Sequence, residues 1–353
     1  MSQQTVEPEA IRRARAEFPK MRERDLAQKL SVSEAELVAA HCGHGVTRIA
    51  PDVERLLKGL EALGPVMALT RNESAVHEKI GVYEKVTASR QHAIVLGSDI
   101  DLRIFPSHWA HGFAVEKGSG ADKRYSLQFF DAAGDAVHKV HLRGDSNLYA
   151  YQQLVETLAV GDQSQQVVTS PPAPKPVETA AEGDAELFDT LRQRWADMKD
   201  VHQFVSILRT LKLSRYQAVH MIGDDFAWRL DGSALGAMMS HAVAQEIPIM
   251  CFVGSRGCIQ IHSGPVMNVK PMGPWLNVMD PTFHLHLRTD HVAELWAVRK
   301  PTKDGHVTSL EAYDAKGSLI IQFFGKRHEG EGEREDWRFL IEHLPRVPRA
   351  TAA

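Results

Sequence analysis

The spacing of apolar residues changes from helical to stranded within each half of the chain. Leucines at positions 56, 57, 60 and 63 recur at helical spacing after Asp52, which predicts a helix capped by Asp52 and ended by Gly64. In the second half, Ser214 is placed to cap a helix that runs through Ala218 and Met221. Four apolar residues indicate a further helix there: Leu187, Leu191, Trp195 and Met198.

After Pro65 and Pro248 the apolar residues recur at every second position, which is the period of a strand. Phenylalanine and leucine alternate with histidine and arginine over 283–288. The segments 306–313 and 318–324 flank the turn 314–317 (DAKG), and a similar pattern surrounds 131–134 (DAAG), so both predict β-hairpins. Helices followed by consecutive hairpins favour an α+β fold with antiparallel sheets.

The two halves repeat one another at a spacing of 183 residues. The segments 131–134 and 113–117 recur as 314–317 and 296–300, and positions 65–67 and 30–31 recur as 248–250 and 213–214. Because the subtraction gives 183 at every anchor, we expect no net insertion between the copies. On this alignment His202 falls on Pro19. A histidine present in only one copy is a candidate for function.

The predicted architecture is α+β, with two tandem structural repeats, each a large antiparallel β-sheet with packed helices. We expect an N-terminal repeat over 1–160, a linker over 161–185 and a C-terminal repeat over 186–349. The linker contains Pro, Gln, Ser and Thr and no aromatic residue, so it cannot bury a core. The last residues, 349–353, are expected to be a frayed end.

Composition excludes several classes of protein. A chain of 353 residues with 43% hydrophobic and 24% charged residues is typical of two globular domains, and a net charge of −4 gives no broad basic surface. The longest apolar run, 247–253, is too short to span a bilayer, so no membrane insertion is expected. With no visible secretory signal and three cysteines that cannot form a closed disulfide framework, we expect a cytoplasmic protein.

His202 has two interpretations. If one helix runs through 195–204, His202 lies four residues after Met198 and seven after Trp195, on the apolar stripe. It is then either a buried histidine bonded to the backbone or an axial metal ligand. In the second case its other ring nitrogen can donate to a backbone carbonyl one turn back.

Four basic residues of the second copy stand beside apolar residues. Each alone is typical of a solvated surface charge, whereas together they could bind an anionic ligand. Haem has two propionates and a flat apolar body, so its site needs an imidazole, an apolar slot and a few cations. The second copy offers all three, with the cations drawn from Arg209, Arg215, Lys300 and Arg327.

Other metal-type motifs are weaker. The run 41–44 (HCGH) lacks a second pair at zinc-like spacing and favours a loop. His284 and His286 share one strand face, where polar alternation on an exposed face is a simpler interpretation than two ligands. The chain has no Cys-x-x-Cys-His, so covalent attachment of haem is not expected.

The segment 25–38 resembles a helix-turn-helix, which raises a different class of function, a haem-responsive DNA-binding regulator. Its second helix carries Glu34 and Glu36 and no base-reading Arg, Asn or Gln. The acidity of the chain also disfavours phosphate contacts. We therefore favour a helical hairpin packed on its sheet and expect no nucleic acid as a partner.

Seven longer segments are specific: 101–109 (DLRIFPSHW), 200–204 (DVHQF), 249–260 (IMCFVGSRGCIQ), 275–281 (WLNVMDP), 299–302 (RKPT), 307–311 (VTSLE) and 324–327 (FGKR). They are similar to segments of the hemin-degrading factor family, which includes the hemin transport protein HmuS. Members are cytoplasmic haem-trafficking and haem-degrading proteins of bacterial haem-uptake operons. The resemblance covers nearly the whole chain outside the linker.

The resemblance implies one haem b, bound non-covalently, with His202 as the proximal iron ligand. It implies that Arg103 and Phe105 reach the distal face from the first copy, so that haem lies between the copies. The other implied contacts are Phe252 in the slot, Arg215 and Lys300 on the propionates, and Gln322 and Arg327 in the polar part of the pocket. Some relatives have a tyrosine where this chain has Ile321, which leaves open whether that hydrogen bond has a counterpart.

The function implied by the resemblance is cytosolic sequestration of imported haem, followed by its delivery or its degradation for iron release. If the protein is an enzyme, Arg103 is the expected catalytic residue, acting electrostatically from the distal side. The chain lacks a complete GxGxxG fingerprint, so electrons for degradation are expected from an external donor. The candidate partners are a haem-importer component, a haem oxygenase and a reductase.

Overall fold

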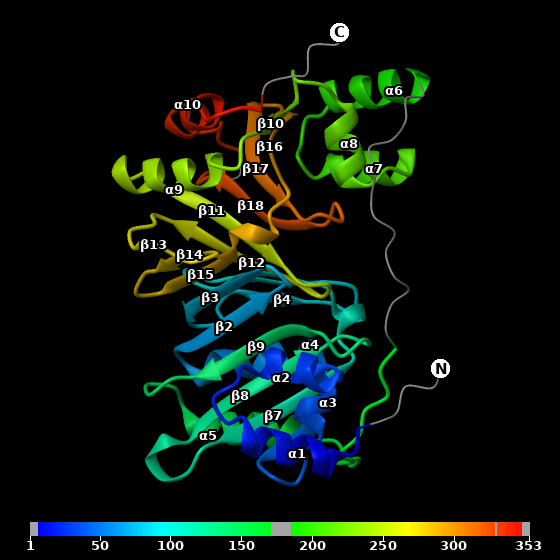
Figure 1. The fold of residues 1–353 in the computed structure, drawn as a ribbon, viewed down its shortest axis with the longest axis vertical. Coiled ribbons are helices and arrows are strands. Elements are labelled where there is room, and N and C mark those ends of the chain that lie inside the picture. The colour runs from blue at the N-terminus through cyan, green and yellow to red at the C-terminus, as the bar shows by residue number, and fades with distance from the viewer. Residues whose placement is uncertain (1–5, 171–184, 329, 348–353) are drawn as a thin grey trace. The chain divides into compact units, whose positions relative to one another are not determined.

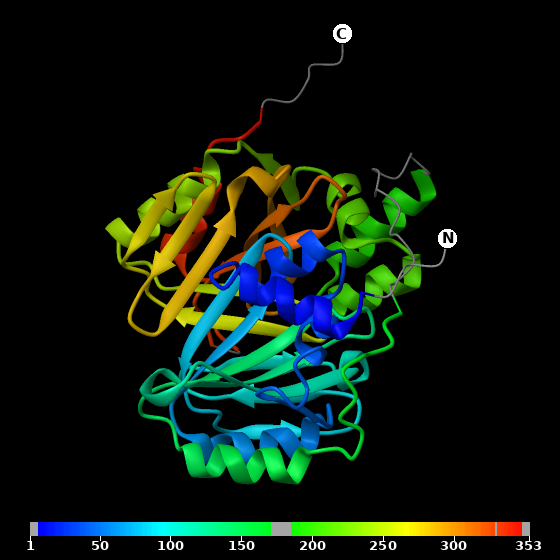
Figure 2. The ribbon, with the colours of Figure 1, turned by 60° about the horizontal axis from the view of Figure 1, so that its bottom comes forward.

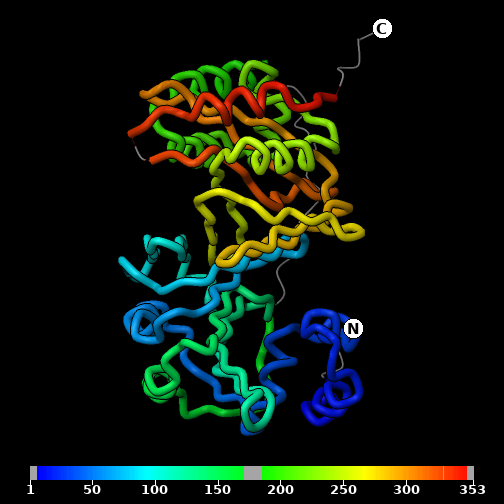
Figure 3. The backbone as a smooth tube through the Cα atoms, turned by 90° about the vertical axis from the view of Figure 1, so that its left-hand side faces the viewer, coloured from blue at the N-terminus to red at the C-terminus, as the bar shows by residue number. Residues whose placement is uncertain are grey.

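The computed structural model describes residues 6–170, 185–328 and 330–347. It divides into two compact units: unit 1 is Met1–Asn72, Val76–Pro174 and Gly254–Gln260, and unit 2 is Glu73–Ala75, Lys175–Val253 and Ile261–Ala353. Each unit therefore combines one repeat with a short turn from the other. Figure 3 traces the first repeat from blue to green and the second from green to red.

Unit 1 begins and ends with helices and has one further helix between its first two strands. The helices are α1 (Pro8–Glu17), α2 (Glu23–Leu30), α3 (Glu34–Ala39), α4 (Val53–Leu60) and α5 (Leu148–Leu158). The strands are β1 (Val46–Ile49), β2 (Val66–Arg71), β3 (Ala75–Gly81), β4 (Val86–Ala88), β5 (Ala93–Leu96), β6 (Asp101–Ile104), β7 (His111–Lys117), β8 (Arg124–Phe130) and β9 (Ala136–Leu142). They pair antiparallel in the orders β1-β7-β8-β9-β2-β3 and β4-β5-β6.

Helices cover both faces of the larger group of strands in unit 1. On one face, Val38 of α3 packs in a cluster with Val46 and Phe113. On the other face, the leucines of α4 and α5 pack with Leu127 and Val140. Figure 2 shows α4 and α5 side by side along the sheet.

Unit 2 repeats the same order of elements. The helices are α6 (Ala185–Ala196), α7 (Gln203–Leu211), α8 (Arg215–Met221), α9 (Ala234–Ala244) and α10 (Glu335–Glu342). The strands are β10 (Ala227–Leu230), β11 (Ile249–Gly254), β12 (Cys258–Gly264), β13 (Val269–Met272), β14 (Trp275–Met279), β15 (Phe283–Arg288), β16 (Glu294–Thr302), β17 (Gly305–Tyr313) and β18 (Leu319–Gly325). Antiparallel pairing gives the orders β10-β16-β17-β18-β11 and β13-β14-β15.

Two hydrophobic cores lie on opposite faces of the unit 2 strands. One joins α6, α7 and α8 to the sheet through Trp195, Phe204 and Trp296. The other joins α9 and α10 to the sheet through Met238 and Trp337. In Figure 1 these two helical groups lie on either side of β10, β16, β17 and β18. The predicted α+β fold of two tandem repeats with antiparallel sheets is confirmed.

The predicted local elements are also confirmed. The side chain of Asp52 accepts a hydrogen bond from the backbone N–H of Arg55. Gly64, whose φ is 67°, ends the short 3-10 turn that follows α4. Ser214 caps α8 in a capping box with Gln217. The alternation over 283–288 appears as β15, whose apolar residues are buried, and the DAAG and DAKG turns join β8 to β9 and β17 to β18.

The prediction of a constant spacing of 183 residues is wrong for the helical part of the repeat. Ser33 caps α3 with Glu36 as Ser214 caps α8 with Gln217, so the spacing there is 181 (214 − 33). Two extra residues follow α9, where Glu246 has a positive φ of 50°, and they restore the spacing of 183 from Pro248 onward. His202 therefore corresponds to Met21 rather than to Pro19 (202 − 181 = 21).

Short segments are anchored within unit 1 by specific bonds. The turn before β12 accepts at the Gly257 carbonyl from the indole N–H of Trp109 (2.9 Å) and from the backbone N–H of Phe105 (3.0 Å). The start of the predicted linker is also bound, because Gln165 donates to the Cys42 carbonyl at 3.0 Å. Residues 171–184 of that linker and the predicted frayed end 349–353 lie outside the described residues. Among the helices that are described, none has the length and apolar character of a membrane span.

Candidate functional site

One face of the unit 2 sheet carries a row of residues contributed by four strands. Phe252 on β11 lies opposite Gln322 on β18, Gln322 opposite Glu311 on β17, and Glu311 opposite Trp296 on β16. Directly opposed residues in an antiparallel sheet point to the same face. The register thus brings Phe252 and Gln322, both predicted site residues, onto one surface with Glu311.

The helices cover only part of this surface. Trp296 is buried in the cluster formed with α6, α7 and α8, whereas Phe252, Gln322 and Phe324 are half-buried. The rings of Phe252 and Phe324 meet edge to face with centroids 5.1 Å apart. The β11–β18 end of the row is therefore an apolar surface with an amide at its border.

Glu311 is the centre of a buried polar network at that border. Its side chain has no exposed surface. Oε1 accepts from four groups and Oε2 from one: Arg215 Nη1 (2.8 Å), Lys300 Nζ (3.2 Å), Ser309 Oγ (2.8 Å) and Gln322 Nε2 (2.8 Å) donate to Oε1, and the Tyr313 hydroxyl (2.6 Å) donates to Oε2. The strands and α8 thereby hold two cations and one carboxylate in one place.

The charges of the network shift each other's proton affinity. Burial alone raises the pKa of Glu311, but the charges of Arg215 and Lys300 outweigh burial and hold that pKa well below its ordinary value. Burial lowers the pKa of Lys300 to about 8, and Arg215 adds to this effect while Glu311 opposes it. Glu311 is therefore a carboxylate at neutral pH, and Lys300 titrates close to the physiological range.

Phe204 links the network to α7. The guanidinium carbon of Arg215 and the ammonium nitrogen of Lys300 each lie 4.9 Å from the centre of its ring. The ring is 1% exposed and also contacts Trp195 edge to face. Both cations are thus packed against an aromatic face two residues after His202.

His202 does not lie inside a helix. The prediction of one helix through 195–204 is wrong, because α6 ends at Ala196, α7 begins at Gln203 and His202 is the residue before α7. A local turn replaces the helix: the Gln203 side chain accepts from the backbone N–H groups of Lys199 and Asp200 at 2.7 and 3.1 Å. The His202 side chain is 88% exposed rather than part of an apolar stripe.

A carboxylate orients the His202 imidazole. Nδ1 lies 2.7 Å from Oδ1 of Asp200, which also accepts from the backbone N–H of His202. The predicted bond to a backbone carbonyl one turn back is therefore replaced by a bond to Asp200. With its proton on Nδ1, the imidazole presents the lone pair of Nε2, which is the arrangement common among metal-binding histidines. The donor set fits an axial ligand of a porphyrin iron.

The four basic residues singled out in the sequence have different surroundings in the structure. They are Arg209, Arg215, Lys300 and Arg327. Lys300 is 4% exposed and Arg215 shares its network, so the expectation of solvated surface charges is wrong for both. Arg327 is half-buried just after β18, and its charge lowers the pKa of Asp200, although the backbone N–H of His202 lowers it more. Arg209 is exposed on α7, and no hydrogen bond in the described part of the chain joins it to Glu311.

The two predicted distal residues lie in unit 1. Arg103 is on β6, where its guanidinium is paired with Asp101 and donates to the Leu102 carbonyl at 3.2 Å. Burial raises the pKa of Asp101, and Arg103 opposes this rise. Phe105 follows β6 and is 38% exposed, with its backbone held by Gly257. The loop thus presents an aromatic side chain from an anchored backbone.

Sequence reasoning missed Glu311, Ser309, Tyr313, Phe204 and Asp200. Glu311 and Ser309 lie in the motif VTSLE, and Asp200 and Phe204 in the motif DVHQF, so the motifs contained them without showing their roles. The strand period placed Ser309, Glu311 and Tyr313 on one face, but a polar residue on a strand is ordinarily solvated. Ile321 points to the opposite face and is buried in the core with α9 and α10. The phenol of the Glu311 network comes from Tyr313.

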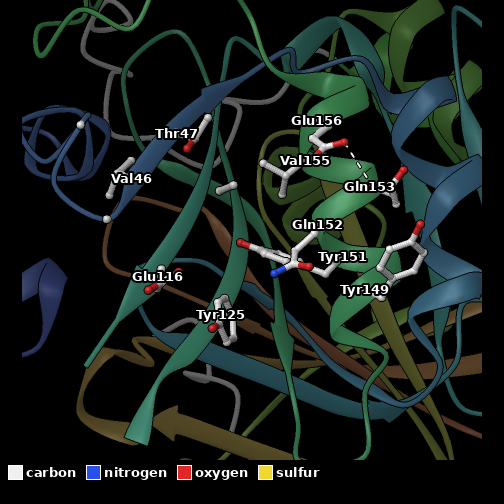
Figure 4. Close-up of a pocket in the computed structure, with 13 residues that line it drawn as sticks. Val46, Thr47, Glu116, Tyr125, Tyr149, Tyr151, Gln152, Gln153, Val155 and Glu156 are labelled. Atoms are coloured by element: carbon white, nitrogen blue, oxygen red, sulfur yellow. Dashed lines mark hydrogen bonds between the residues drawn. The ribbon is translucent and has the colours of Figure 1, made fainter. Parts of the chain in front are cut away.

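Two surface pockets lie away from the residues that are predicted to bind haem. In unit 1, α5 and strands β1, β7 and β8 line a pocket of about 740 Å³, with Thr47, Glu116 and Tyr125 on the strand side and Tyr149 and Glu156 on the helix side (Figure 4). In unit 2, α9 and α10 line a pocket of about 610 Å³. Neither pocket contains a residue of the predicted haem site.

The competing motifs have structural roles. Residues 41–44 form a loop, as expected, with His41 Nδ1 3.0 Å from the Leu37 carbonyl. His286 Nδ1 lies 2.6 Å from the side-chain oxygen of Asn277 on the neighbouring strand. Within the described residues, no group of three or more His, Cys, Asp or Glu side chains is arranged to hold a metal ion.

The helix-turn-helix segment forms a helical pair whose second helix is buried. In α3, Leu37 and Val38 are 2% and 4% exposed, and Glu34 forms ion pairs with Arg71 and Lys139. A helix that reads bases must present its side chains to the major groove. The packing of α3 on its sheet therefore agrees with the helical hairpin that the sequence favours.

Comparison with known proteins identifies relatives over nearly the whole chain. A family model described as "Haemin-degrading HemS.ChuX domain" matches residues 31–158 and again 212–344. The hemin transport protein HmuS of Yersinia pestis is 39% identical over 332 residues, which are 94% of this chain and 95% of that protein. The family model thus matches twice, once within each repeat.

Two solved structures show the same fold. The holo form of PhuS, a heme-binding protein from Pseudomonas aeruginosa, superposes with a TM-score of 0.91 at 45% identity, covering 96% of this chain and 98% of that chain. ChuS, described as an E. coli heme oxygenase, gives a TM-score of 0.83 at 36% identity, covering 94% of this chain and 98% of that chain. The relatives therefore include one protein described by binding and one described by catalysis.

Proposed function

Because the chain belongs to the family of haemin-degrading HemS.ChuX-domain proteins, we propose that it binds one haem b non-covalently and delivers it or degrades it for iron release. Membership of this family supports haem handling in general. The observation that carries the proposal for this chain is the position of His202 and Asp200 next to the Phe204, Arg215 and Lys300 cluster. This part of unit 2 combines an exposed imidazole, an apolar surface, a buried ammonium group and a half-buried guanidinium.

In this proposal each residue has a defined task. His202 offers Nε2 to the iron while Asp200 holds the ring, and Phe252 supplies apolar contact to the porphyrin. Arg215 and Lys300 donate to a propionate, with Gln322 and Arg327 completing the polar border. Bound haem would supply a redox-active iron whose behaviour depends on the groups around it.

Arg103 and Phe105 remain the proposed distal residues. A guanidinium has five N–H donors, so pairing with Asp101 leaves Arg103 able to donate elsewhere. Its proposed contribution, if the protein degrades haem, is a positive charge and a hydrogen bond on the distal side. Electrons would come from an external reductase or reductant.

We also propose a cytoplasmic location and a haem-importer component or a haem oxygenase as partners. All three cysteines, Cys42, Cys251 and Cys258, are buried free thiols, which suits a reducing compartment. Burial raises the pKa of Cys258 to about 12, so this thiol is protonated at neutral pH. No step of the proposed function uses these cysteines.

Titration with hemin tests the binding proposal. We expect a Soret band that saturates at one equivalent and a bound spectrum that differs from free hemin. The isolated second repeat should bind hemin with an altered spectrum, since it lacks Arg103 and Phe105. A titration without a stoichiometric endpoint would contradict the proposal.

Delivery and degradation are separated by the fate of the porphyrin. A carrier returns intact haem to an apo-acceptor such as apomyoglobin. An enzyme, supplied with O₂ and a reductant, converts bound haem to an open-chain tetrapyrrole and free iron. Catalase must be present, because peroxide from the reductant bleaches haem without enzyme. Loss of turnover on addition of catalase would leave delivery as the function.

A further inference from the structure

We propose that Glu311 is the positioning residue of the carboxylate-binding part of the site, which holds Arg215, Lys300 and Gln322 ready for one propionate of the ligand. The proposal rests on the proposed function only in naming haem as the source of that carboxylate. Glu311 itself is too deeply buried to be counted among the residues that contact the porphyrin. Its role follows from the bonds it makes.

The first argument is the number of donors on one oxygen. Oε1 of Glu311 accepts from Arg215, Lys300, Ser309 and Gln322, whereas a carboxylate oxygen has about two lone-pair sites. Four donors therefore share an acceptor that satisfies about half of them well. A second carboxylate placed beside Gln322, whose side chain is half-buried, would relieve this surplus.

The second argument is the balance of charge. Arg215 and Lys300 bring two positive charges and Glu311 brings one negative charge, and no other charged group bonds to Glu311 in the described part of the chain. One positive charge remains for a ligand. The network is therefore matched to a single carboxylate rather than to a dianion such as a phosphate ester.

The third argument is the effect of Glu311 on Lys300. Burial and the charge of Arg215 both favour the neutral amine of Lys300, and Glu311 is the group that opposes them. Lys300 also lies over the uncharged ring of Phe204. The other groups bonded to Glu311 are the hydroxyls of Ser309 and Tyr313 and the amide of Gln322, which are neutral, since burial raises the pKa of Tyr313 well above its ordinary value. Without Glu311, the pKa of Lys300 would fall further below its ordinary value, and less of the charged form that attracts a propionate would remain at neutral pH.

The experiment measures how much the carboxylates of the ligand contribute to affinity. Hemin and hemin dimethyl ester differ only in those groups. The dissociation constant of the ester divided by that of hemin therefore reports carboxylate recognition. In Glu311→Gln, which keeps the size of the side chain, we expect this ratio to fall about tenfold at pH 7, as a charge-assisted bond becomes a neutral one. In Glu311→Gln/Lys300→Arg, whose guanidinium stays charged, the ratio should recover.

The ligand-free protein gives an independent readout. The Lys300 side chain, followed by ¹³C NMR through its Cε, should titrate near pH 8 in the wild type and at lower pH in Glu311→Gln. Glu311→Asp keeps the charge, and its midpoint should stay within one pH unit of the wild type. The Asp variant also carries the test if the Gln variant does not fold.

The matched control is Gln128→Glu, because Gln128 occupies the position of Glu311 in the first repeat (311 − 183 = 128). This control should leave the affinity ratio unchanged. A ratio that is unchanged or increased in Glu311→Gln would overturn the positioning role, even though hemin still binds. If the wild type binds neither hemin nor its ester, the proposed function fails instead.

Discussion

The polar network of the second repeat has a counterpart in the first repeat, in which the charged side chains are distributed differently between helices and strands. At the equivalent positions, Glu23 and Glu34 stand where the second repeat has Phe204 and Arg215 (23 = 204 − 181 and 34 = 215 − 181). On the strands, Gln128 and Lys139 replace Glu311 and Gln322, at the spacing of 183. In the first repeat the helices thus contribute the carboxylates and the strands contribute the cations. In the second repeat the helix contributes the cation Arg215, and the strands contribute both the cation Lys300 and the carboxylate Glu311.

The two networks differ in how their bonds are shared. In the first repeat, Glu23 pairs with Lys117 and Lys139, and Glu34 pairs with Arg71 and Lys139, so each carboxylate oxygen takes one cation. In the second, one oxygen of Glu311 takes four donors. A saturated network stabilises a fold, while a network with surplus donors can accept a ligand. Duplication of the fold makes this distinction visible within one chain.

The largest expected effect is on the free energy of unfolding, and it should differ between Glu311 and its first-repeat equivalent Gln128. Glu311→Ala leaves the buried Lys300 and the half-buried Arg215 without their carboxylate and should cost about 3–5 kcal/mol of unfolding free energy. Gln128→Ala removes one bond, from Nε2 to Ser126 at 3.1 Å, and should cost about 1 kcal/mol. Urea denaturation followed by circular dichroism measures both. Equal losses would mean that the two networks do the same structural work.

The next effect concerns His202, the proposed iron ligand, which has no histidine counterpart in the first repeat. His202→Ala should shift the Soret band and weaken hemin affinity by at least roughly 10–100-fold, the range seen when even a partner of a metal ligand is removed. Met21→Ala changes the equivalent residue of the first repeat and is the control. An unchanged ferric spectrum in His202→Ala would rule out this imidazole as the axial ligand.

The sequence predicted the scaffold better than the site. Apolar periods and turn residues identified the caps at Asp52 and Ser214 and the two hairpins, because these features depend on neighbours in the sequence. The turn at 197–202 was missed because Gln203 breaks the helix through two side-chain bonds that the apolar period does not reveal. The burial of Lys300 depends on Glu311, Arg215 and Phe204, which come together only through strand register and helix packing.

A tenfold effect is expected from pH, and it belongs to the second repeat alone. Lys300 has a pKa of about 8, so its charge is lost between pH 7 and 9 and hemin affinity should fall about tenfold over that interval. Lys300→Arg should remove this dependence. The folded protein releases the proton near pH 8 while the unfolded chain holds it to a higher pH. Since the unfolded chain binds more protons between about pH 8 and the ordinary Lys pKa of about 10.4, the free energy of unfolding contributed by Lys300 rises as the pH rises through that interval. An unaltered pH profile in Lys300→Arg would assign the titration to another group.

The smallest effect on affinity is expected from the first repeat. Arg103→Ala removes a side chain that already pairs with Asp101, so hemin affinity should change less than about threefold, within the range of an exposed ion pair. The spectrum of bound ferric haem should nevertheless change, because the proposed distal donor is lost. Lys117→Ala, which alters an ion pair of the first repeat remote from β6 in sequence, is the control and should change neither property. If Arg103→Ala also changes neither property, Arg103 is not the distal donor.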